Sequence, residues 1–432
     1  MGILSTVTGF LSGGDTLKQV GGIIDDLHMS GEEKAEAKQK LETILIQAEQ
    51  AAQEQVSARW EADMKHGSTL SKNIRPLVLI FLVILISFIG AAGLYSAAGG
   101  SYSPWASRHL IRLVVFLILA MILALINIKF IYKFAYIFFI LSLLLLLSVE
   151  LIGVFGKGAT RWINVFGFSI QPSELIKITI ILALARFYHD LKFDEIKRIK
   201  NLFFPILILF LPFALVVIQP DLGTALSIAM LGILILFASG IRIWKFVLGF
   251  FVLILSIPLS LNYLQPYQKD RIFSFLNPEA DALGRGYQLI QSKIALGSGG
   301  LTGKGFLEGS QSYLQYLPEK QTDFIFTLIG EEFGFIGTMF IILLFLLLIS
   351  VCFYISIKSN HIFGRILSIG VGSNLFIYVI MNISMVSGLM PVVGIPLPLV
   401  SYGGSAMLAI IISLGLVLNA ELNGNLKKLH NA

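Results

Sequence analysis

Long runs of apolar residues follow one another along the chain after Ile74, separated by short polar segments. A membrane-spanning helix needs about 20 predominantly apolar residues. About ten runs approach this length, at 76–95, 110–127, 133–154, 174–189, 202–218, 222–240, 244–262, 323–356, 363–386 and 400–419. This pattern predicts an all-α polytopic membrane protein with about ten transmembrane helices.

The composition agrees with this interpretation and excludes a soluble protein. The 432 residues are 56% hydrophobic and only 13% charged, whereas soluble domains have about a quarter charged residues. The single cysteine, Cys352, lies inside an apolar run, so disulfides and cysteine metal sites are excluded. The first thirty residues lack the basic start and apolar core of a cleavable signal peptide, so we expect the spanning helices to direct insertion.

Basic residues predict the orientation. Short connections on one side contain Lys129, Lys133, Lys192, Lys197, Arg198, Lys200, Arg242, Lys245, Lys358, Arg365, Lys427 and Lys428. By the positive-inside rule this side is cytoplasmic, and so are the N- and C-termini of the chain. The opposite side receives the loops rich in Gly and Pro, including a large extracytoplasmic loop, 262–322, between the seventh and eighth helices.

Residues 1–73 differ in kind from the rest of the chain. They contain 11 acidic and 7 basic side chains, a net charge of −4, in a chain of net charge +6. Ser30 and Glu33 match a capping box, and the following stretch to Lys65 is rich in strong helix formers. Running into 71–80, the segment resembles the N-terminal part of phage and gene-transfer-agent holins. We predict a cytoplasmic helical extension before a membrane domain of residues 74–432.

Asp323 is the first candidate for chemistry, because ionised groups are costly at membrane depth and persist mainly where they face a cavity, a partner or a substrate. It opens a predicted helix that Thr322 can cap, and Thr327, Gly330 and Gly334 follow on the same face. This face leaves room for a substrate beside the carboxylate. Alternatively, Asp323 only complements the positive helix N-terminus.

Two more carboxylates follow on the same helix. Glu331 lies about 80° and Glu332 about 180° around the helix from Asp323, at about 100° per residue. The three carboxylates therefore cannot all serve one site. We expect at least one of them to pair with a basic group on another helix.

Polar residues also mark the starts of two other helices. Glu174 and Lys177 are three residues apart and can pair on one helix surface, either as a structural ion pair or to hold substrate. Asp221 follows a proline, where a capping carboxylate is ordinary. A capping role is the simpler interpretation of Asp221 unless it faces Lys177.

The predicted outer loops contribute weaker candidates. The glycine-rich stretch 297–305 could cradle a phosphate through backbone N–H groups, with Lys304 as a point charge, or it is a flexible turn. It lacks the Walker A spacing. Arg161 and Trp162 place a cation beside an interfacial ring, suited either to a membrane belt or to substrate. The large loop contains 5 acidic and 6 basic residues, so its charges nearly balance and no nucleic-acid partner is expected.

The ordered set of motifs is specific although each part is weak. It comprises Ala159-Thr-Arg-Trp, Gln171-Pro-Ser-Glu-Leu-Ile-Lys, Gln219-Pro-Asp-Leu-Gly-Thr, Gln291-Ser-Lys-Ile-Ala-Leu-Gly-Ser-Gly-Gly, Leu317-Pro-Glu-Lys-Gln-Thr-Asp and Gly394-Ile-Pro-Leu-Pro-Leu-Val-Ser-Tyr-Gly-Gly-Ser. Together these motifs resemble the SEDS family over about residues 76–428. The segments 309–319 and 391–398 resemble the cell-elongation branch more than the cell-division branch.

The resemblance implies a peptidoglycan glycosyltransferase of the bacterial inner membrane that polymerises lipid II on its outer face, with a class B penicillin-binding protein as partner. It implies that Asp323 is catalytic, as general base or as the group that positions a metal, with Mg²⁺ or another divalent cation as the expected cofactor. The remaining candidates are expected to bind substrate: Glu174, Lys177, Asp221, Arg161, Trp162, Gln291, Ser292, Lys293, Lys304 and Ser401.

Two other classes of function fit the same chain. A lipid II flippase would also have about ten helices with internal charges, although the polar groups gather on one side and no inverted repeat is visible. A non-catalytic scaffold for cell-wall enzymes, assembled through residues 1–73, is the third candidate. Polymer from the wild type but not from Asp323→Asn would establish the enzyme. Deletion of residues 1–73 tests the scaffold, since unchanged polymerisation would make that segment an accessory.

Overall fold

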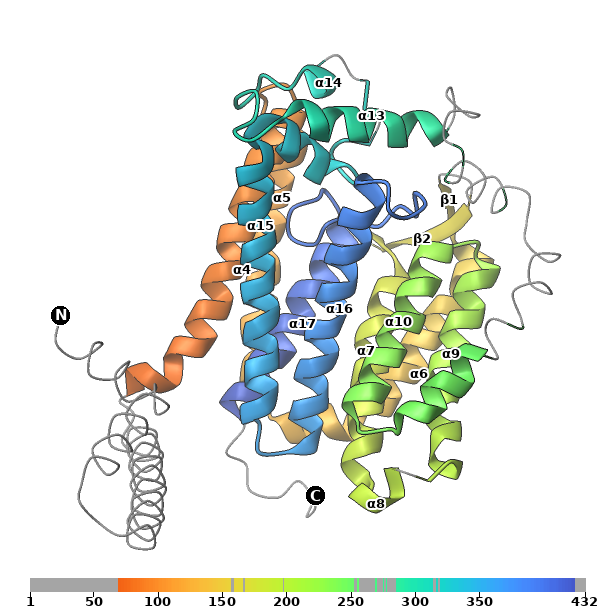
Figure 1. Cartoon of the computed structure of the whole chain (residues 1–432). Helices are drawn as coiled ribbons and strands as arrows, with labels where there is room; N and C mark the ends of the chain where they lie inside the picture. Colours follow the sequence, from red (N-terminus) through yellow and green to blue (C-terminus); the bar gives the residue numbers. More distant parts are fainter. Residues whose placement is uncertain are drawn as a thin grey trace, which may run out of the picture. The chain divides into compact units, whose positions relative to one another are not determined.

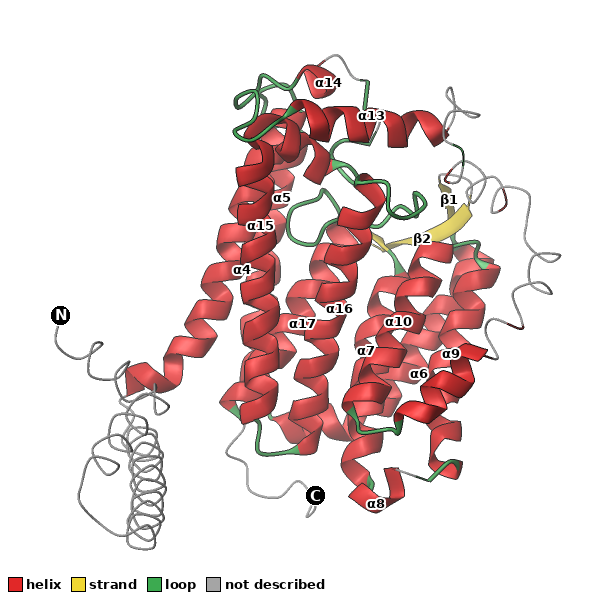
Figure 2. Ribbon diagram, viewed as in Figure 1, coloured by secondary structure: helices red, strands yellow, loops and turns green. Residues whose placement is uncertain are grey.

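The computed structural model describes residues 69–251 and 285–423, except for 157, 158, 166, 167, 197, 314, 315 and 318, together with the single residues 255, 269, 275 and 277. The chain divides into two units, Met1–Ile74 and Arg75–Ala432. Most of the predicted extension 1–73, including its capping box, lies outside the described residues. The second unit is dominated by long helices, which confirms the predicted fold class (Figures 1 and 2).

Among the described residues, the bundle contains nine long helices: α4 (Thr69–Ala97), α5 (Trp105–Leu125), α6 (Ile128–Ile152), α7 (Pro172–Asp190), α9 (Phe203–Ile218), α10 (Leu222–Ala238), α15 (Ile325–Lys358), α16 (Ile362–Val386) and α17 (Gly404–Leu422). Two short helical pieces, α8 (Phe193–Ile196) and η1 (Lys200–Leu202), connect α7 to α9. Within the described part of the chain, seven helices are long and apolar enough to cross a membrane.

The predicted total of ten spans stays a prediction. The 17-residue helix α10 is apolar but shorter than those seven, and α7 contains Glu174, Lys177 and Arg186. The seventh predicted span, 244–262, is described only in part, where residues 243–251 are helical. The tenth predicted span begins late, because residues 391–403 form a loop before α17.

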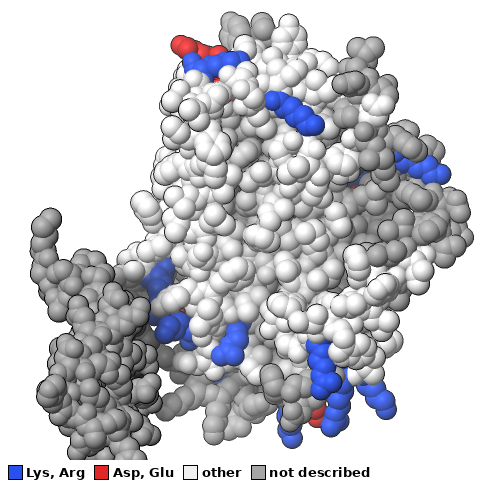
Figure 3. Space-filling model, viewed as in Figure 1, with Lys and Arg blue, Asp and Glu red and all other residues white. Residues whose placement is uncertain are grey.

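Small residues allow the closest helix contacts. Gly415 of α17 lies against α5, where an added Cβ would be 2.9 Å from the Cα of Ala120. Such positions let backbones approach closely in membrane proteins, where dispersion rather than water exclusion drives helix association. One face of the molecule shows a broad uncharged band between charged groups at its two ends, as expected of a protein surrounded by lipid (Figure 3).

The connection between α6 and α7, predicted as a loop, is a small antiparallel sheet. Its strands are β1 (Val154–Gly156), β2 (Ala159–Val165) and β3 (Phe168–Ile170), in the order β1-β2-β3. Val154 pairs with Trp162, and Ile163 with Ile170. The strands are too short to give a clear alternating pattern, so the sequence analysis missed them.

The large predicted outer loop also contains helices, α13 (Arg285–Ser298) and α14 (Ser310–Tyr313). Helix α13 lies across the ends of α15 and α16, as Figure 1 shows. After α13 the chain turns back through a glycine-rich segment, residues 299–305, that joins the backbone of α15.

This junction occurs at Gly334, where α15 has non-helical backbone angles, φ 64° and ψ −160°. The N–H groups of Phe335 and Ile336 donate to the carbonyls of Gly300 and Leu301, at 2.9 and 3.1 Å. Backbone polar groups need such partners where water is absent. The glycine-rich segment therefore completes the hydrogen bonding of an interrupted helix.

Candidate functional site

Most polar motifs gather at one end of the bundle. This end is formed by the starts of α7, α10, α15 and α17 and the end of α16, beneath α13 and beside the strands (Figure 1). It is the end that the basic-residue pattern predicts to face away from the cytoplasm. Three small networks lie here, centred on the Glu174–Lys177 pair, on Asn382 and on Asp221. Helix α16 contributes side chains to the first two.

The first network is the predicted Glu174–Lys177 pair. Lys177 Nζ lies 2.9 Å from Glu174 Oε1, and the two side chains are 2% and 6% exposed. Tyr378 of α16 donates its hydroxyl to Glu174 Oε2, accepts from Lys177 and places its ring under the ammonium, 4.2 Å from the ring centroid. The pair is thus fully enclosed and joined to a second helix.

Asn382 lies one turn further along α16 from Tyr378. Its amide donates to the carbonyl of Asp323 at 2.9 Å and to that of Ile395 at 2.8 Å. It thereby ties the turn before α15 to the loop before α17. Sequence analysis missed both α16 residues, although polar side chains spaced four apart in an apolar helix are a visible signal of one buried polar face.

Asp323 itself is half-buried in the turn before α15. The predicted cap is wrong: α15 begins at Ile325, and the hydroxyl of Thr322 bonds to the carbonyl and carboxylate of Glu319 instead. Asp323 Oδ2 would be 3.5 Å from a Cβ added to Gly394. The carboxylate therefore lies beside the Pro/Gly-rich loop 394–403 rather than on the helix face.

Asp221 belongs to the third network. It caps α10, since its Oδ1 accepts from the N–H of Thr224 at 3.3 Å and its Oδ2 accepts from the hydroxyl of the same residue at 2.9 Å. Arg161 of β2 approaches Oδ2 to 3.8 Å and also donates to the carbonyl of Pro220. Among the described residues the ion-pair partner of Asp221 is Arg161, not Lys177. Trp162 follows on β2 and is half-buried.

The loop before α17 holds itself in shape. The buried hydroxyl of Ser401 accepts from the N–H of Leu397 at 2.8 Å. Ser405 donates to the carbonyl of Ser169 in β3 at 2.9 Å. The hydroxyls of this motif thus fix the loop against the sheet beside Asp323.

Helix α13 presents its motif to the same end. The buried Ser292 bonds to the hydroxyl of Thr327 at 2.8 Å and donates to the carbonyl of Val386 at 2.7 Å, so it joins α13 to α15 and α16. Gln291 is half-buried, whereas Lys293 is exposed. The stem of Lys293 crosses Gly388, where an added Cβ would be 2.0 Å from its Cε.

The glycine-rich segment does not have the geometry of a phosphate cradle. The N–H groups of Lys304 and Gly305 donate to the carbonyls of Glu331 and Glu332, both at 3.0 Å, so they are already used. Lys304 Nζ lies 2.7 Å from the fully buried carboxylate of Glu331. The expected pairing of one carboxylate of α15 with a basic group is confirmed, although the base comes from a loop.

An apolar groove runs along the side of the bundle. It has a volume of about 550 Å³ and lies between α5, α6, α7 and α17. Its lining includes Phe130, Phe138, Leu145, Leu175, Ile178 and Ile412. Only Ser142 and Thr179 interrupt the apolar surface, and their hydroxyls bond to each other at 2.5 Å. Within the described part of the chain, no three His, Cys, Asp or Glu side chains cluster as metal ligands.

Comparison with known proteins assigns the bundle to a family. The model of the FtsW/RodA/SpoVE cell cycle proteins matches residues 73–425. The chain belongs to this family. The family match begins where the predicted N-terminal extension ends, so the holin resemblance of residues 1–73 stays a prediction.

Relatives within the family carry related names. The chain is 43% identical to the peptidoglycan glycosyltransferase MrdB of Escherichia coli K12 over 283 residues, 65% of this chain and 76% of that protein. It is 38% identical to the probable peptidoglycan glycosyltransferase FtsW of Trichlorobacter lovleyi over 355 residues, 79% of this chain and 92% of that protein. A solved chain of a peptidoglycan synthase complex superposes with a TM-score of 0.70 and 32% identity, covering 81% of this chain and 98% of that one.

Proposed function

We propose that this chain is a peptidoglycan glycosyltransferase that polymerises lipid II at the outer face of the inner membrane. The observation that carries the proposal is the position of Asp323. This carboxylate lies in a turn at the end of a family-matched bundle, beside the loop that begins at Gly394 and in a segment tied to α16 through Asn382. A half-buried carboxylate held by its backbone is suited to positioning a reacting hydroxyl.

In the proposed reaction, Asp323 accepts the proton of an acceptor sugar 4-hydroxyl as that oxygen attacks the anomeric carbon of the donor. A bond forms between this oxygen and the anomeric carbon, and the bond from that carbon to the diphosphate oxygen breaks. The electron pair leaves with the lipid diphosphate, and the configuration inverts. An ordinary Asp has a pKa of about 3.9, so positioning rather than basicity must supply most of the effect.

The departing diphosphate needs positive charge. Lys293 is exposed at this end and can approach an anion, and Arg161 is half-buried and paired with Asp221 at the long distance of 3.8 Å. Lys177 and Lys304 are engaged by buried carboxylates at 2.9 and 2.7 Å. As an alternative to acting as base, Asp323 would hold a Mg²⁺ or another divalent ion, because such ions use one or two carboxylates together with substrate phosphates; in that alternative the ion would supply positive charge at the site.

The prenyl chain of the substrate fits the apolar groove between α5, α6, α7 and α17. Its lining hydrophobic residues match the lipid in polarity. In this proposal the N- and C-termini of the chain are cytoplasmic, by the positive-inside rule. A class B penicillin-binding protein is the proposed partner, and the motifs at 309–319 and 391–398 favour cell elongation and rod-shape maintenance over division.

The test is glycan synthesis by the full chain in nanodiscs, with its partner, from lipid II. We expect polymer from the wild type and from Asp190→Asn, and none from Asp323→Asn with an unchanged melting temperature. Asp190 is a matched control, because it is exposed and bonds to Tyr132 from the far end of α7. Polymer from Asp323→Asn would refute the role of Asp323. Absence of polymer from every variant would favour transport or scaffolding.

A further inference from the structure

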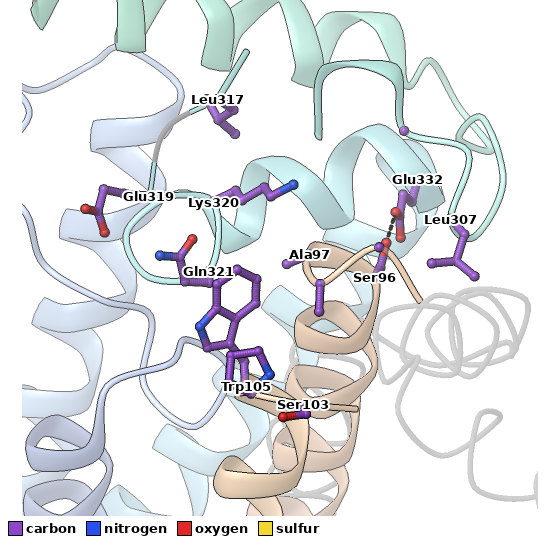
Figure 4. A pocket seen from close by; sticks show the side chains of 14 residues that line it. Ser96, Ala97, Ser103, Trp105, Leu307, Leu317, Glu319, Lys320, Gln321 and Glu332 are labelled. Atoms are coloured by element: carbon purple, nitrogen blue, oxygen red, sulfur yellow. Dashed lines mark hydrogen bonds between the residues drawn. The ribbon is translucent and has the colours of Figure 1, made fainter. Parts of the chain in front are cut away.

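A second cavity lies outside the networks described above. It has a volume of about 1000 Å³ and is bounded by the end of α4, the start of α5, Glu332 of α15 and, from the segment between α13 and α15, Leu307, Gly309, Leu317 and 319–321 (Figure 4). This volume is at the upper end of the range found for small-molecule sites. Gln321 lines it two residues before Asp323, and its carbonyl accepts from the N–H of Tyr402 at 2.8 Å. The cavity and the proposed catalytic carboxylate therefore share one turn.

Glu332 provides an incomplete polar group on one side of this cavity. The residue is 2% exposed, and its Oε1 accepts a hydrogen bond from the hydroxyl of Ser96. Its other oxygen, Oε2, has no hydrogen-bond partner among the described residues. A buried carboxylate oxygen without a donor is costly, so a ligand with an O–H or N–H group would find an acceptor there.

The opposite side carries a mixed set of groups. Figure 4 shows the ring of Trp105 beneath Gln321, with Lys320 extending across the cavity toward Glu332. Glu319 lies on the same turn as Lys320. Burial lowers the pKa of Lys320, and the nearby charge of Glu332 opposes this shift. The side chains thus offer donors, acceptors and one amphipathic ring face.

Backbone strain marks two residues of the lining. Leu307 has φ 69° and Glu319 has φ 56°, both in the left-handed region that side chains other than glycine seldom adopt. Strained residues of this kind cluster at ligand sites, where the surrounding structure holds them. Both lie on the segment that closes the cavity over α4 and α5.

The chemistry of the lining selects the class of ligand. Two carboxylates against one lysine disfavour a phosphate, and the polar groups disfavour a hydrocarbon chain. A neutral ligand rich in hydroxyl and amide groups would match the polar side chains of Glu332, Gln321 and Lys320 and lay its apolar face on Trp105. Sugar rings have this combination of groups.

We propose that this cavity binds N-acetylated sugar units of the glycan strand already made, and so retains the strand between successive additions. The proposal rests on the proposed function, since the strand is its product. The same sugar chemistry occurs in the lipid-linked donor. Retention of the strand and binding of the donor differ in their effect on product length.

Binding is tested first, without polymerisation. Full-length chain in nanodiscs is titrated with chitotetraose, a soluble chain of β-1,4-linked N-acetylglucosamine, by saturation-transfer NMR. We expect binding to the wild type and to Asp323→Asn, and about tenfold weaker binding to Trp105→Ala, as for other aromatic anchors. Trp244→Ala is the matched control, because Trp244 is 50% exposed outside the cavity. Equal binding by both tryptophan variants would overturn the proposal.

Product length is tested next, with lipid II as substrate. We expect Glu332→Gln and Trp105→Ala to give shorter strands while the initial rate of lipid II consumption stays within about twofold of the wild type. Glu308→Gln, an exposed residue outside the cavity lining, serves as control. If Glu332→Gln has a lowered Tm, the strand length made by Trp105→Ala is the deciding measurement. Strands of unchanged length would overturn strand retention. An initial rate that falls as much as the strand length would also overturn it, because that result would assign the cavity to donor binding.

Because chitotetraose binding does not require catalysis, the two proposals fail separately. A chain that binds the tetrasaccharide through Trp105 but makes no polymer would refute the proposed function and keep the saccharide site. A chain that makes polymer of normal length without this binding would keep the proposed function and refute the saccharide site.

Discussion

The buried Glu174–Lys177 pair allows the sharpest prediction. Replacing Lys177 by Met removes one partner of a 2.9 Å contact whose side chains are 2% and 6% exposed, and leaves Glu174 with only the hydroxyl of Tyr378. Breaking one side of such a pair costs about 3 to 5 kcal/mol in the free energy of unfolding. With about 2.1 cal/mol/K of unfolding entropy per residue over Arg75–Ala432, this is a decrease in Tm of about 4 to 7 °C.

A double variant separates stability from catalysis. We expect Glu174→Gln together with Lys177→Met to recover most of the lost Tm, because no uncompensated charge is left buried. The assay is thermal melting in nanodiscs combined with polymer yield from lipid II. Recovery of Tm without recovery of polymer would assign the pair to substrate, whereas recovery of both would make it structural. A Lys177→Met chain that melts like the wild type would refute the reasoning.

Two further predictions concern single positions. Gly334→Ala should lower Tm, because its backbone angles, φ 64° and ψ −160°, are essentially restricted to glycine and cost other residues about 1 to 3 kcal/mol. The added Cβ would also meet the amide nitrogen of Gly303 at 2.4 Å, whereas Gly297→Ala, with open space around it, should not lower Tm. His361 caps α16 by accepting from Gly364, and burial lowers its pKa. Its stabilising contribution is therefore present above pH ~6.5 and lost as pH falls through the folded pKa. When Tm is measured from neutral to mildly acidic pH, it should fall less in His361→Asn than in the wild type.

Much of the fold follows from apolar length alone. Helices of about 20 apolar residues can hide their backbone groups in lipid, so runs such as 363–386 predict α16 almost to the residue. The sheet at 154–170 was not predictable in this way, because its strands depend on pairing with each other. The start of the last helix was placed at residue 400 instead of Gly404, because residues 400–403 belong to the loop that Ser401 closes by bonding to Leu397.

The site was predictable where its residues are close in sequence. Glu174 and Lys177 are one helical turn apart, so their pairing could be inferred from spacing. Tyr378 and Asn382 lie about two hundred residues later, and their contacts with Glu174 and Asp323 depend on tertiary packing. The glycine-rich segment was a candidate phosphate cradle, but its N–H groups donate to carbonyls of α15. No local sequence pattern reveals these contacts.

The junction at Gly334 has a mechanical consequence. Residues 300–305 bond to α15 on both sides of Gly334. Lys304 and Gly305 donate to carbonyls before it, whereas the carbonyls of Gly300 and Leu301 accept from N–H groups after it. The glycine-rich segment therefore bridges the interruption, and the outer piece of α15, with the Asp323 turn before it, is held to the rest of the helix by a second stretch of backbone.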